Sequence, residues 1–271
     1  MVQYNPLHYL PTAEELPDSD DTPVDNELQI LIPTLLRAIL ALLWAERKDW
    51  FFGVNMGVYY EPEVAAIVPD GFLSLGVERF KPDGKLRLSY VVWQENNIVP
   101  QWVLEVVSKT PGGEYDEKIT KYAQIGVLYY VIYNPDYWKR DKHDPFEVYR
   151  LVNGSYKRQT ENPVWMPEIK LGIGYEQGTH EGYTREWLYW YNQHGARFPA
   201  PADVIEQERQ RSEQERRRAE QERRRAEQER RRAEQERQRA EQAEQQLEQE
   251  RRLREELLNR LRERGINLDE L

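Results

Sequence analysis

The chain has 271 residues, no cysteine and a net charge of −10. Without thiols it forms neither disulfides nor thiolate metal sites, and a reducing compartment such as the cytoplasm is the expected location. The acidic balance argues against non-specific affinity for nucleic acid, which arises when Lys and Arg neutralise phosphates. Of the 48 acidic and 38 basic residues, 20 and 19 lie in 203–271, which leaves 28 acidic and 19 basic in the preceding part.

The composition changes abruptly near Pro199-Ala200-Pro201. An aromatic-rich sequence precedes this point, and almost only Glu, Gln, Arg and Ala follow it. We therefore predict an N-terminal extended segment, a folded domain, a short linker and a helical tail, over residues 1–24, 25–198, 199–204 and 205–271. The N-terminal segment lacks the basic and apolar regions of a signal peptide, so secretion is not expected.

The first predicted element is a helix over Leu28–Trp44, LQILIPTLLRAILALLW. Asp25 and Asn26 before it are typical of a helix start. The segment is short for a membrane span and carries Pro33 and Arg37, so we interpret it as a core helix. Its Leu and Ile residues surround most of the helix, as in an element packed against a sheet.

Short apolar runs after this helix predict strands. In chain order they are Trp50–Tyr60, Val64–Val68 with a continuation over Phe72–Val77, Arg87–Trp93 and Gln101–Ser108. The second run ends at Pro69-Asp70, and the last carries Glu105 near its middle. The last run is apolar enough to be buried on both faces.

A helix, a strand and a hairpin complete the predicted domain. Glu114–Ile125 has apolar residues at helical spacing, and Gly126 stands where a helix end is expected. Val127–Tyr133 predicts a strand, and Asn153-Gly154 joins the two strands of a hairpin over 146–159. This order of elements predicts an α/β fold in which helices flank a mixed sheet.

Two acidic residues and a lysine are the candidates for a functional site. Asp70 ends one predicted strand and Glu105 lies inside another, where an unpaired carboxylate is costly to bury. If these strands are adjacent, the carboxylates meet and supply the oxygen ligands that Mg²⁺ prefers. Lys118 would then orient a water molecule or stabilise charge at a phosphate. The four histidines lie outside these apolar elements: His8, His143, His180 and His194.

Each candidate also has an ordinary structural interpretation. Pro69-Asp70 is a common turn opening, and Lys118 is compatible with a solvated helix face. Glu105 could pair with a buried arginine. Of the three, only the buried Glu105 is difficult to explain without a function.

The motifs around these residues resemble the Uma2 family, which is abundant in cyanobacteria and similar in fold to PD-(D/E)XK nucleases such as type II restriction endonucleases. The resemblance covers roughly Asp25–Gly174. It rests on Pro69-Asp70 and on the segments 102–108 (WVLEVVS), 114–122 (EYDEKITKY) and 126–132 (GVLYYVI). It implies a restriction-endonuclease-like sheet, DNA as substrate, and Asp70 and Glu105 as ligands of Mg²⁺ or Mn²⁺.

The sequence departs from the superfamily pattern at Val107, where that pattern has its lysine. The resemblance implies that Lys118 replaces this lysine from the following helix, which the long lysine stem allows. It also implies Glu27, on the first helix, as an additional acidic group near the metal. The predicted function is a Mg²⁺-dependent DNA endonuclease; the alternative is a non-catalytic interaction or scaffold protein on a vestigial nuclease fold.

The tail repeats a seven-residue unit, AEQERRR, almost unchanged from Ser212 to Arg239. Neither Pro nor Gly occurs between Ala202 and Arg264, and Glu and Arg recur at i,i+4, so we predict a long charged helix. One Ala per heptad makes a weak coiled-coil seam, so a single helix and a weak coiled coil are both compatible with the repeat.

The end of the tail is richer in apolar residues and predicts a homodimer through a leucine stripe. The stripe consists of Leu247, Leu253, Leu257, Leu258 and Leu261. A segment that binds another partner and a solubilising spacer are the alternatives. Gly265 is expected to end the helix, leaving Ile266–Leu271 as a short terminal segment.

Overall fold

The computed structural model describes residues 10–17 and 26–263. The chain divides into two compact units, Met1–Val204 and Ile205–Leu271. Asp25, Gly265 and the expected terminal segment Ile266–Leu271 lie outside the described residues, as does most of the predicted N-terminal segment.

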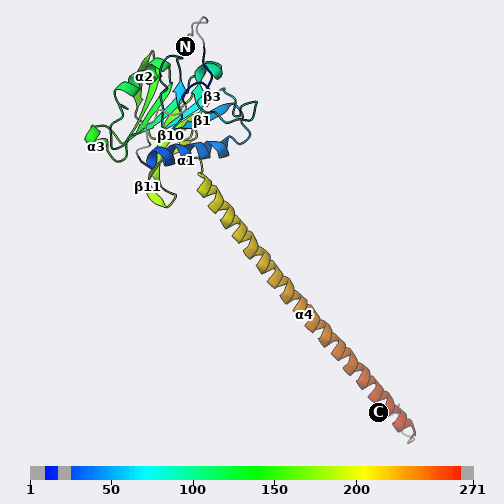
Figure 1. Ribbon diagram of the computed structural model, residues 1–271. Coiled ribbons are helices and arrows are strands. Elements are labelled where there is room, and N and C mark those ends of the chain that lie inside the picture. The colour runs from blue at the N-terminus through cyan, green and yellow to red at the C-terminus, as the bar shows by residue number, and fades with distance from the viewer. Residues whose placement is uncertain (1–9, 18–25, 264–271) are drawn as a thin grey trace. The chain divides into compact units, whose positions relative to one another are not determined.

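The centre of the first unit is a six-stranded mixed sheet with the order β1-β3-β5-β6-β7-β8 (Figure 1). Its strands are β1 (Trp50–Val54), β3 (Gly71–Leu75), β5 (Trp102–Val106), β6 (Tyr129–Tyr133), β7 (Phe146–Val152) and β8 (Ser155–Gln159). β5 and β6 are parallel, and the other neighbours pair antiparallel. A parallel pair needs a crossover connection, which the helix α2 (Glu117–Ile125) supplies.

Smaller elements surround this sheet. A three-stranded sheet consists of β9 (Val164–Met166), β10 (Leu171–His180) and β11 (Tyr183–Tyr191). A short parallel pair joins β2 (Val58–Tyr59) to β4 (Tyr90–Val91), which leads into the 3₁₀ turn η1 (Val92–Gln94). The one-turn helix α3 (Trp138–Asp141) follows β6.

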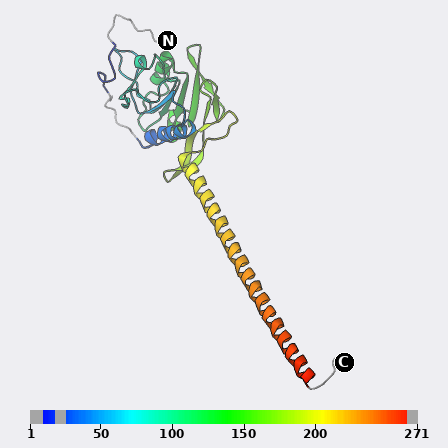
Figure 2. The same cartoon turned by 90° about the vertical axis from the view of Figure 1, so that its right-hand side faces the viewer.

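Each face of the main sheet contributes to a separate hydrophobic core, because successive residues of a strand point to opposite sides. On one side Trp102, Leu104 and Val106 of β5 pack with α1 (Leu28–Leu43) and the three-stranded sheet. On the other side Val103 packs with α2. Figures 1 and 2 show α1, in blue, along its side of the strands. Glu105 shares the face of Val103, so its carboxylate enters the α2 core.

The predicted first helix is confirmed as α1. The Asn26 side chain accepts hydrogen bonds from the backbone N–H groups of Leu28 (2.9 Å) and Gln29 (3.3 Å), so it satisfies donors that the first turn leaves open. Among the described helices none combines the length and the apolar character that a membrane span requires.

The central strand elements and the hairpin are confirmed, whereas two expected strands are wrong. Val64–Val68 forms no strand and makes only one bridge, between Ile67 and Val58. Pro62 and Pro69 flank this run and remove backbone donors, so it cannot extend a ladder. Asp70 therefore lies directly before strand β3, instead of at the end of a strand over Val64–Val68. The strand expected over Arg87–Trp93 is reduced to Tyr90–Val91.

The second unit consists mainly of α4 (Pro201–Glu263), 63 residues with no buried side chain, and the predicted long charged helix is confirmed. Its start is capped, because the Asp203 carboxylate accepts a hydrogen bond from the N–H of Ala200 (2.9 Å). Proline at the first helical position fits the same geometry. Along the helix Glu and Arg pair at i,i+4, as in Glu213 with Arg217 (2.6 Å).

Trp190 joins α1, the main sheet and β11, and its removal tests this packing. Its indole is fully buried, donates a hydrogen bond to the carbonyl of Leu36 (3.0 Å) and lies 4.9 Å from the ring of Trp102. We expect Trp190→Ala to lower the free energy of unfolding by about 3–5 kcal/mol, measured by denaturant titration. Trp165→Ala, at a position 36% exposed on β9, is the control and should change it by less than about 1 kcal/mol. If both variants lose the same free energy of unfolding, Trp190 is not the residue that joins α1, the main sheet and β11.

Candidate functional site

Asp70 and Glu105 lie next to each other on the α2 side of the main sheet. β3 and β5 pair antiparallel with Gly71 opposite Leu104, so one residue further along this register Asp70 is opposite Glu105. Directly opposed residues share a face, with Cβ atoms about 5 Å apart. The side chains are buried, at 7% and 2% exposure, and Asp70 accepts a hydrogen bond from the N–H of Val106 (2.6 Å). The sequence-predicted convergence of two carboxylates therefore occurs.

Helix α2 brings two polar groups onto Glu105. Lys118 Nζ donates to Oε2 of Glu105 (2.7 Å), and the hydroxyl of Tyr122 donates to Oε1 (2.5 Å). Residues four apart on a helix lie on the same face, so a lysine and a tyrosine at this spacing reach one carboxylate together. Lys118 lies where sequence reasoning expects it. Tyr122 was not among the predicted site residues, although its position four residues after Lys118 on the same helix indicates that both side chains lie on one face.

A third carboxylate, Glu114, stands beside this pair and was also not among the predicted site residues. Its side chain is 5% exposed and accepts hydrogen bonds from the N–H of Gly112, at 2.9 and 3.2 Å. The hydroxyl of Tyr130 holds the carbonyl of Glu114 at 2.8 Å. The turn at Pro111-Gly112-Gly113 therefore brings the Glu114 carboxylate back towards the sheet. The sequence of a turn does not show by itself where the next side chain points.

The three charged groups strongly affect each other's pKa values. Burial, followed by the negative charge of Glu105, raises the pKa of Asp70 well above its ordinary value. Burial also raises the pKa of Glu105, although Lys118 opposes the effect. For Lys118 burial acts to lower the pKa, but the Glu105 carboxylate outweighs it and the pKa is raised. The site has more buried negative than positive charge, so it favours an added proton or cation.

The donor set fits a hard divalent cation. Among the described residues no group of three or more His, Cys, Asp or Glu side chains is arranged to hold a metal ion. Mg²⁺, however, commonly takes one or two protein carboxylates and keeps several waters. Asp70 uses only Oδ2 for its hydrogen bond to Val106. The pair Asp70 and Glu105 therefore offers the type and number of oxygens that Mg²⁺ needs.

The remaining expectations concern Val107 and Glu27. Val107 is buried in the α2 core, so the position of the superfamily lysine is filled by packing, and the lysine that reaches Glu105 comes from α2. Glu27 is exposed at the start of α1, and no described hydrogen bond or ion pair connects it with either carboxylate. Gln29 nearby reaches the carbonyl of Val106 (3.4 Å), so this helix end adjoins the site. A role for Glu27 stays a prediction.

The first unit is thus an α/β protein in which helices flank a mixed sheet, and two buried carboxylates and a lysine gather on one face of that sheet. The family model Uma2, described as "Putative restriction endonuclease", matches residues 20–176. The chain belongs to the Uma2 family, and the resemblance read from its motifs is confirmed. The matched range contains Asp70, Glu105 and Lys118.

Among solved structures, a protein from Anabaena variabilis ATCC 29413, described as "a putative nuclease belonging to DUF820", is similar to this chain. The two are 13% identical, with a TM-score of 0.41, and the match covers 58% of this chain and 88% of the other. No curated protein matches the sequence.

The raised pKa of Asp70 has a consequence for stability. The folded protein holds this proton over a pH range in which the unfolded chain, with an ordinary value of 3.8, has lost it. Stability therefore falls as the pH rises from 3.8 through the folded pKa. Asp70→Asn keeps an oxygen for the Val106 N–H and removes this loss. We expect its Tm to equal or exceed that of the wild type at neutral pH, and the difference to vanish below pH 3.8.

Asp141→Asn is the matched control, with the opposite sign. A hydrogen bond from Arg140 lowers the pKa of Asp141, so its charge adds stability above the ordinary value that is lost as the pH falls through the folded pKa. This variant should lose Tm at neutral pH. If Asp70→Asn loses as much Tm at neutral pH as Asp141→Asn does, the charged form of Asp70 stabilises the folded protein, and the prediction is wrong.

Proposed function

We propose that this protein is a Mg²⁺-dependent DNA endonuclease that hydrolyses phosphodiester bonds at Asp70, Glu105 and Lys118. Membership of the Uma2 family supports a nuclease-like function. The observation that carries the proposal is the buried carboxylate pair with Lys118 Nζ 2.7 Å from Glu105. Carboxylates that supply oxygen ligands and an ammonium that meets a phosphate are the groups that metal-assisted phosphodiester hydrolysis requires.

Each side chain has a distinct role in this proposal. Asp70 and Glu105 would hold Mg²⁺, or Mn²⁺ in its place; when bound, the cation would supply Lewis acidity and lower the pKa of a bound water. Tyr122 keeps one oxygen of Glu105 fixed (2.5 Å), so the carboxylate cannot rotate away. Lys118 is 27% exposed and can leave Glu105 for a phosphate oxygen, where negative charge develops.

The non-catalytic scaffold is the second candidate function, and one observation favours it. Both oxygens of Glu105 already accept hydrogen bonds, from Lys118 and Tyr122. A carboxylate satisfied in this way is stable without any ligand, as in a purely structural ion pair. The two candidates differ in whether Lys118 leaves Glu105 when substrate and cation arrive.

Cleavage of plasmid and single-stranded DNA with Mg²⁺ or Mn²⁺ tests the catalytic proposal. We expect Asp70→Asn and Glu105→Gln to abolish cleavage, because each removes a charged oxygen ligand. Lys118→Met should lower the rate by a factor of about 10² to 10³, the usual effect of losing one group that stabilises developing charge. Glu117→Gln, an exposed neighbour on the same helix, is the control and should leave the rate unchanged.

Two results would contradict the proposal in different ways. Metal-dependent cleavage that survives both Asp70→Asn and Glu105→Gln would refute the site assignment but not the activity. Absence of cleavage of every DNA substrate, with folded protein and either metal, would favour the scaffold function. Chelation by EDTA should stop the wild-type reaction, which separates a metal-dependent nuclease from a metal-independent contaminant.

We further propose that α4 forms a homodimer through its leucine stripe, which would supply one copy of the site for each DNA strand. Leu247, Leu253 and Leu257 are 51%, 66% and 60% exposed on a helix in which Glu, Gln and Arg predominate. Exposed leucines at the end of a solvated helix gain most by burial against a second apolar stripe.

The dimer is tested by sedimentation equilibrium of the full chain. Replacing Leu253 and Leu257 by Glu should shift the mass from dimer to monomer, because two charges would be buried in the seam. The control replaces Gln245 and Gln249 by Glu, which adds the same charge without removing a leucine, and should stay dimeric. A monomeric wild type at all concentrations would refute the dimer and leave the spacer alternative.

A further inference from the structure

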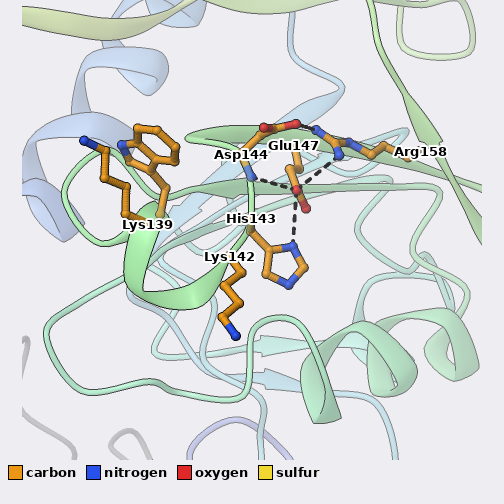
Figure 3. Close-up of a pocket in the computed structure, with 7 residues that line it drawn as sticks. Lys139, Lys142, His143, Asp144, Glu147 and Arg158 are labelled. Carbon is orange, nitrogen blue, oxygen red and sulfur yellow. Dashed lines mark hydrogen bonds and ion pairs between the residues drawn. The ribbon is translucent and has the colours of Figure 1, made fainter.

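A second cluster of charged side chains surrounds a surface pocket of about 440 Å³ next to α3 (Figure 3). The labelled side chains come from α3, the loop after it, and the strands β7 and β8: Lys139, Lys142, His143, Asp144, Glu147 and Arg158. None of them belongs to the carboxylate pair described above. The pocket is therefore a separate feature of the first unit.

The pocket lies on the same face of the main sheet as the candidate site. Glu105 is opposite Ile132 in the β5–β6 pair, and Ile132 is opposite Glu147 in the β6–β7 pair. Since opposed residues share a face, Glu105, Ile132 and Glu147 form one row across three strands. Neighbouring strands are about 4.8 Å apart, so the backbones at Glu105 and Glu147 are separated by about 10 Å.

The acidic groups of the pocket are satisfied within it. The Glu147 carboxylate, 1% exposed, accepts hydrogen bonds from the N–H of Asp144 (3.1 Å) and the hydroxyl of Tyr149 (2.5 Å). It also lies 3.3 Å from His143 Nδ1 and 3.4 Å from Arg158. Arg158 pairs in addition with Asp144. Figure 3 draws the contacts of Glu147 with Asp144, His143 and Arg158, and of Asp144 with Arg158, as dashed lines, so both carboxylates already have partners within the pocket.

Two lysines of the pocket, Lys139 and Lys142, form no ion pair with the acidic side chains that line it. Lys139 and Lys142 are exposed, and neither forms an ion pair with any residue in the described part of the chain. Lys139 Nζ lies 5.2 Å from the ring centroid of Trp138, which steadies its long stem. Lys142 ends α3 in a left-handed conformation, with φ of 59°. With histidine counted as neutral, the side chains that line the pocket carry three positive and two negative charges, so the pocket has a small positive excess in a unit that is acidic as a whole.

Helix α3 is also tied to the loop that leads into the candidate site. Arg140 donates a hydrogen bond to the carbonyl of Lys109, in the segment after β5. That segment continues to Glu114 beside the carboxylate pair. The backbone of α3 is therefore connected to the candidate site by the sheet register and by this contact.

We propose that Lys139 and Lys142 bind the phosphate backbone of the DNA strand that enters the candidate site; this inference rests on the proposed function. Phosphates follow one another at about 3.4 Å along the axis of one strand, so the roughly 10 Å between the Glu105 and Glu147 backbones corresponds to about three nucleotides, and Lys139 and Lys142 lie at the pocket that Glu147 lines. An acidic peptide would satisfy the same charges. Glu147 of the pocket lies in one row with Glu105. This arrangement favours DNA, whose phosphates would extend from the candidate site towards the pocket.

Binding of a labelled DNA duplex to the full chain, followed by fluorescence anisotropy with Ca²⁺ in place of Mg²⁺, tests the proposal without requiring cleavage. The double variant Lys139→Ala/Lys142→Ala should bind roughly tenfold more weakly at moderate salt, irrespective of DNA sequence. The slope of log K against log salt should become shallower by about two, one for each lost phosphate contact.

The control is Lys48→Ala/Lys85→Ala, which removes the same charge from exposed positions. Lys48 precedes β1 and lies with Gly76 and Arg79 at the end of β3 remote from Asp70. This variant should bind as the wild type does. Circular dichroism melts of both variants check that the fold is intact, which exposed lysines should not affect.

The outcomes separate this inference from the catalytic proposal. Equal affinity and equal salt slope for the two double variants would overturn the inference, while cleavage at Asp70 and Glu105 would remain testable by itself. No binding of the duplex by the wild type would overturn it, and so would tighter binding of polyglutamate through the same lysines. Lysine-dependent binding by a protein that cuts no DNA would uphold the contact and count only against catalysis.

Discussion

The buried ion pair between Glu105 and Lys118 is the interaction on which the arrangement of the first unit depends. A carboxylate inside a central strand has no water to solvate it, so partners must come from an element packed on the sheet. Lys118 and Tyr122 provide both partners from one face of α2, at 2.7 and 2.5 Å. Because both contacts need the same helix orientation, they determine how α2 lies over β5 and β6.

The parallel pairing of β5 and β6 explains how a lysine from a helix can serve the strand. The crossover returns the chain over the sheet, so residues of α2 stand above the strand that carries Glu105. Val107 then has no need to supply an amine and fills the core instead. Replacing a buried ion pair by apolar residues is often stabilising, so stability alone does not require the ion pair between Glu105 and Lys118, nor the neighbouring Asp70 with its raised pKa.

The sequence predicted elements whose signals are local. Leu28–Trp44 has continuous apolar content, and Asn153-Gly154 dictates a tight hairpin, so α1 and β7–β8 were predicted correctly. The long hairpin β10–β11 was missed because glycines and charged residues interrupt the alternation of β10, and because β11 is buried continuously from Trp187 to Tyr191 instead of on one face only. The hydrogen bonds of Tyr122 and the returning Glu114 depend on packing between distant segments, which spacing along one element does not contain.

Net charge and local charge have different consequences in this protein. The acidic excess of the first 202 residues weakens non-specific attraction to DNA at long range, because that attraction follows the summed field. At contact distance the relevant charges are those without internal partners, and around α3 these are Lys139 and Lys142 rather than Asp144 or Glu147. Beside them the carboxylate pair repels a phosphate until a cation neutralises it. Productive binding of a phosphodiester would therefore depend on Mg²⁺ at one point of the sheet face and on lysines at another, so a nuclease built in this way can be acidic overall and still engage its substrate.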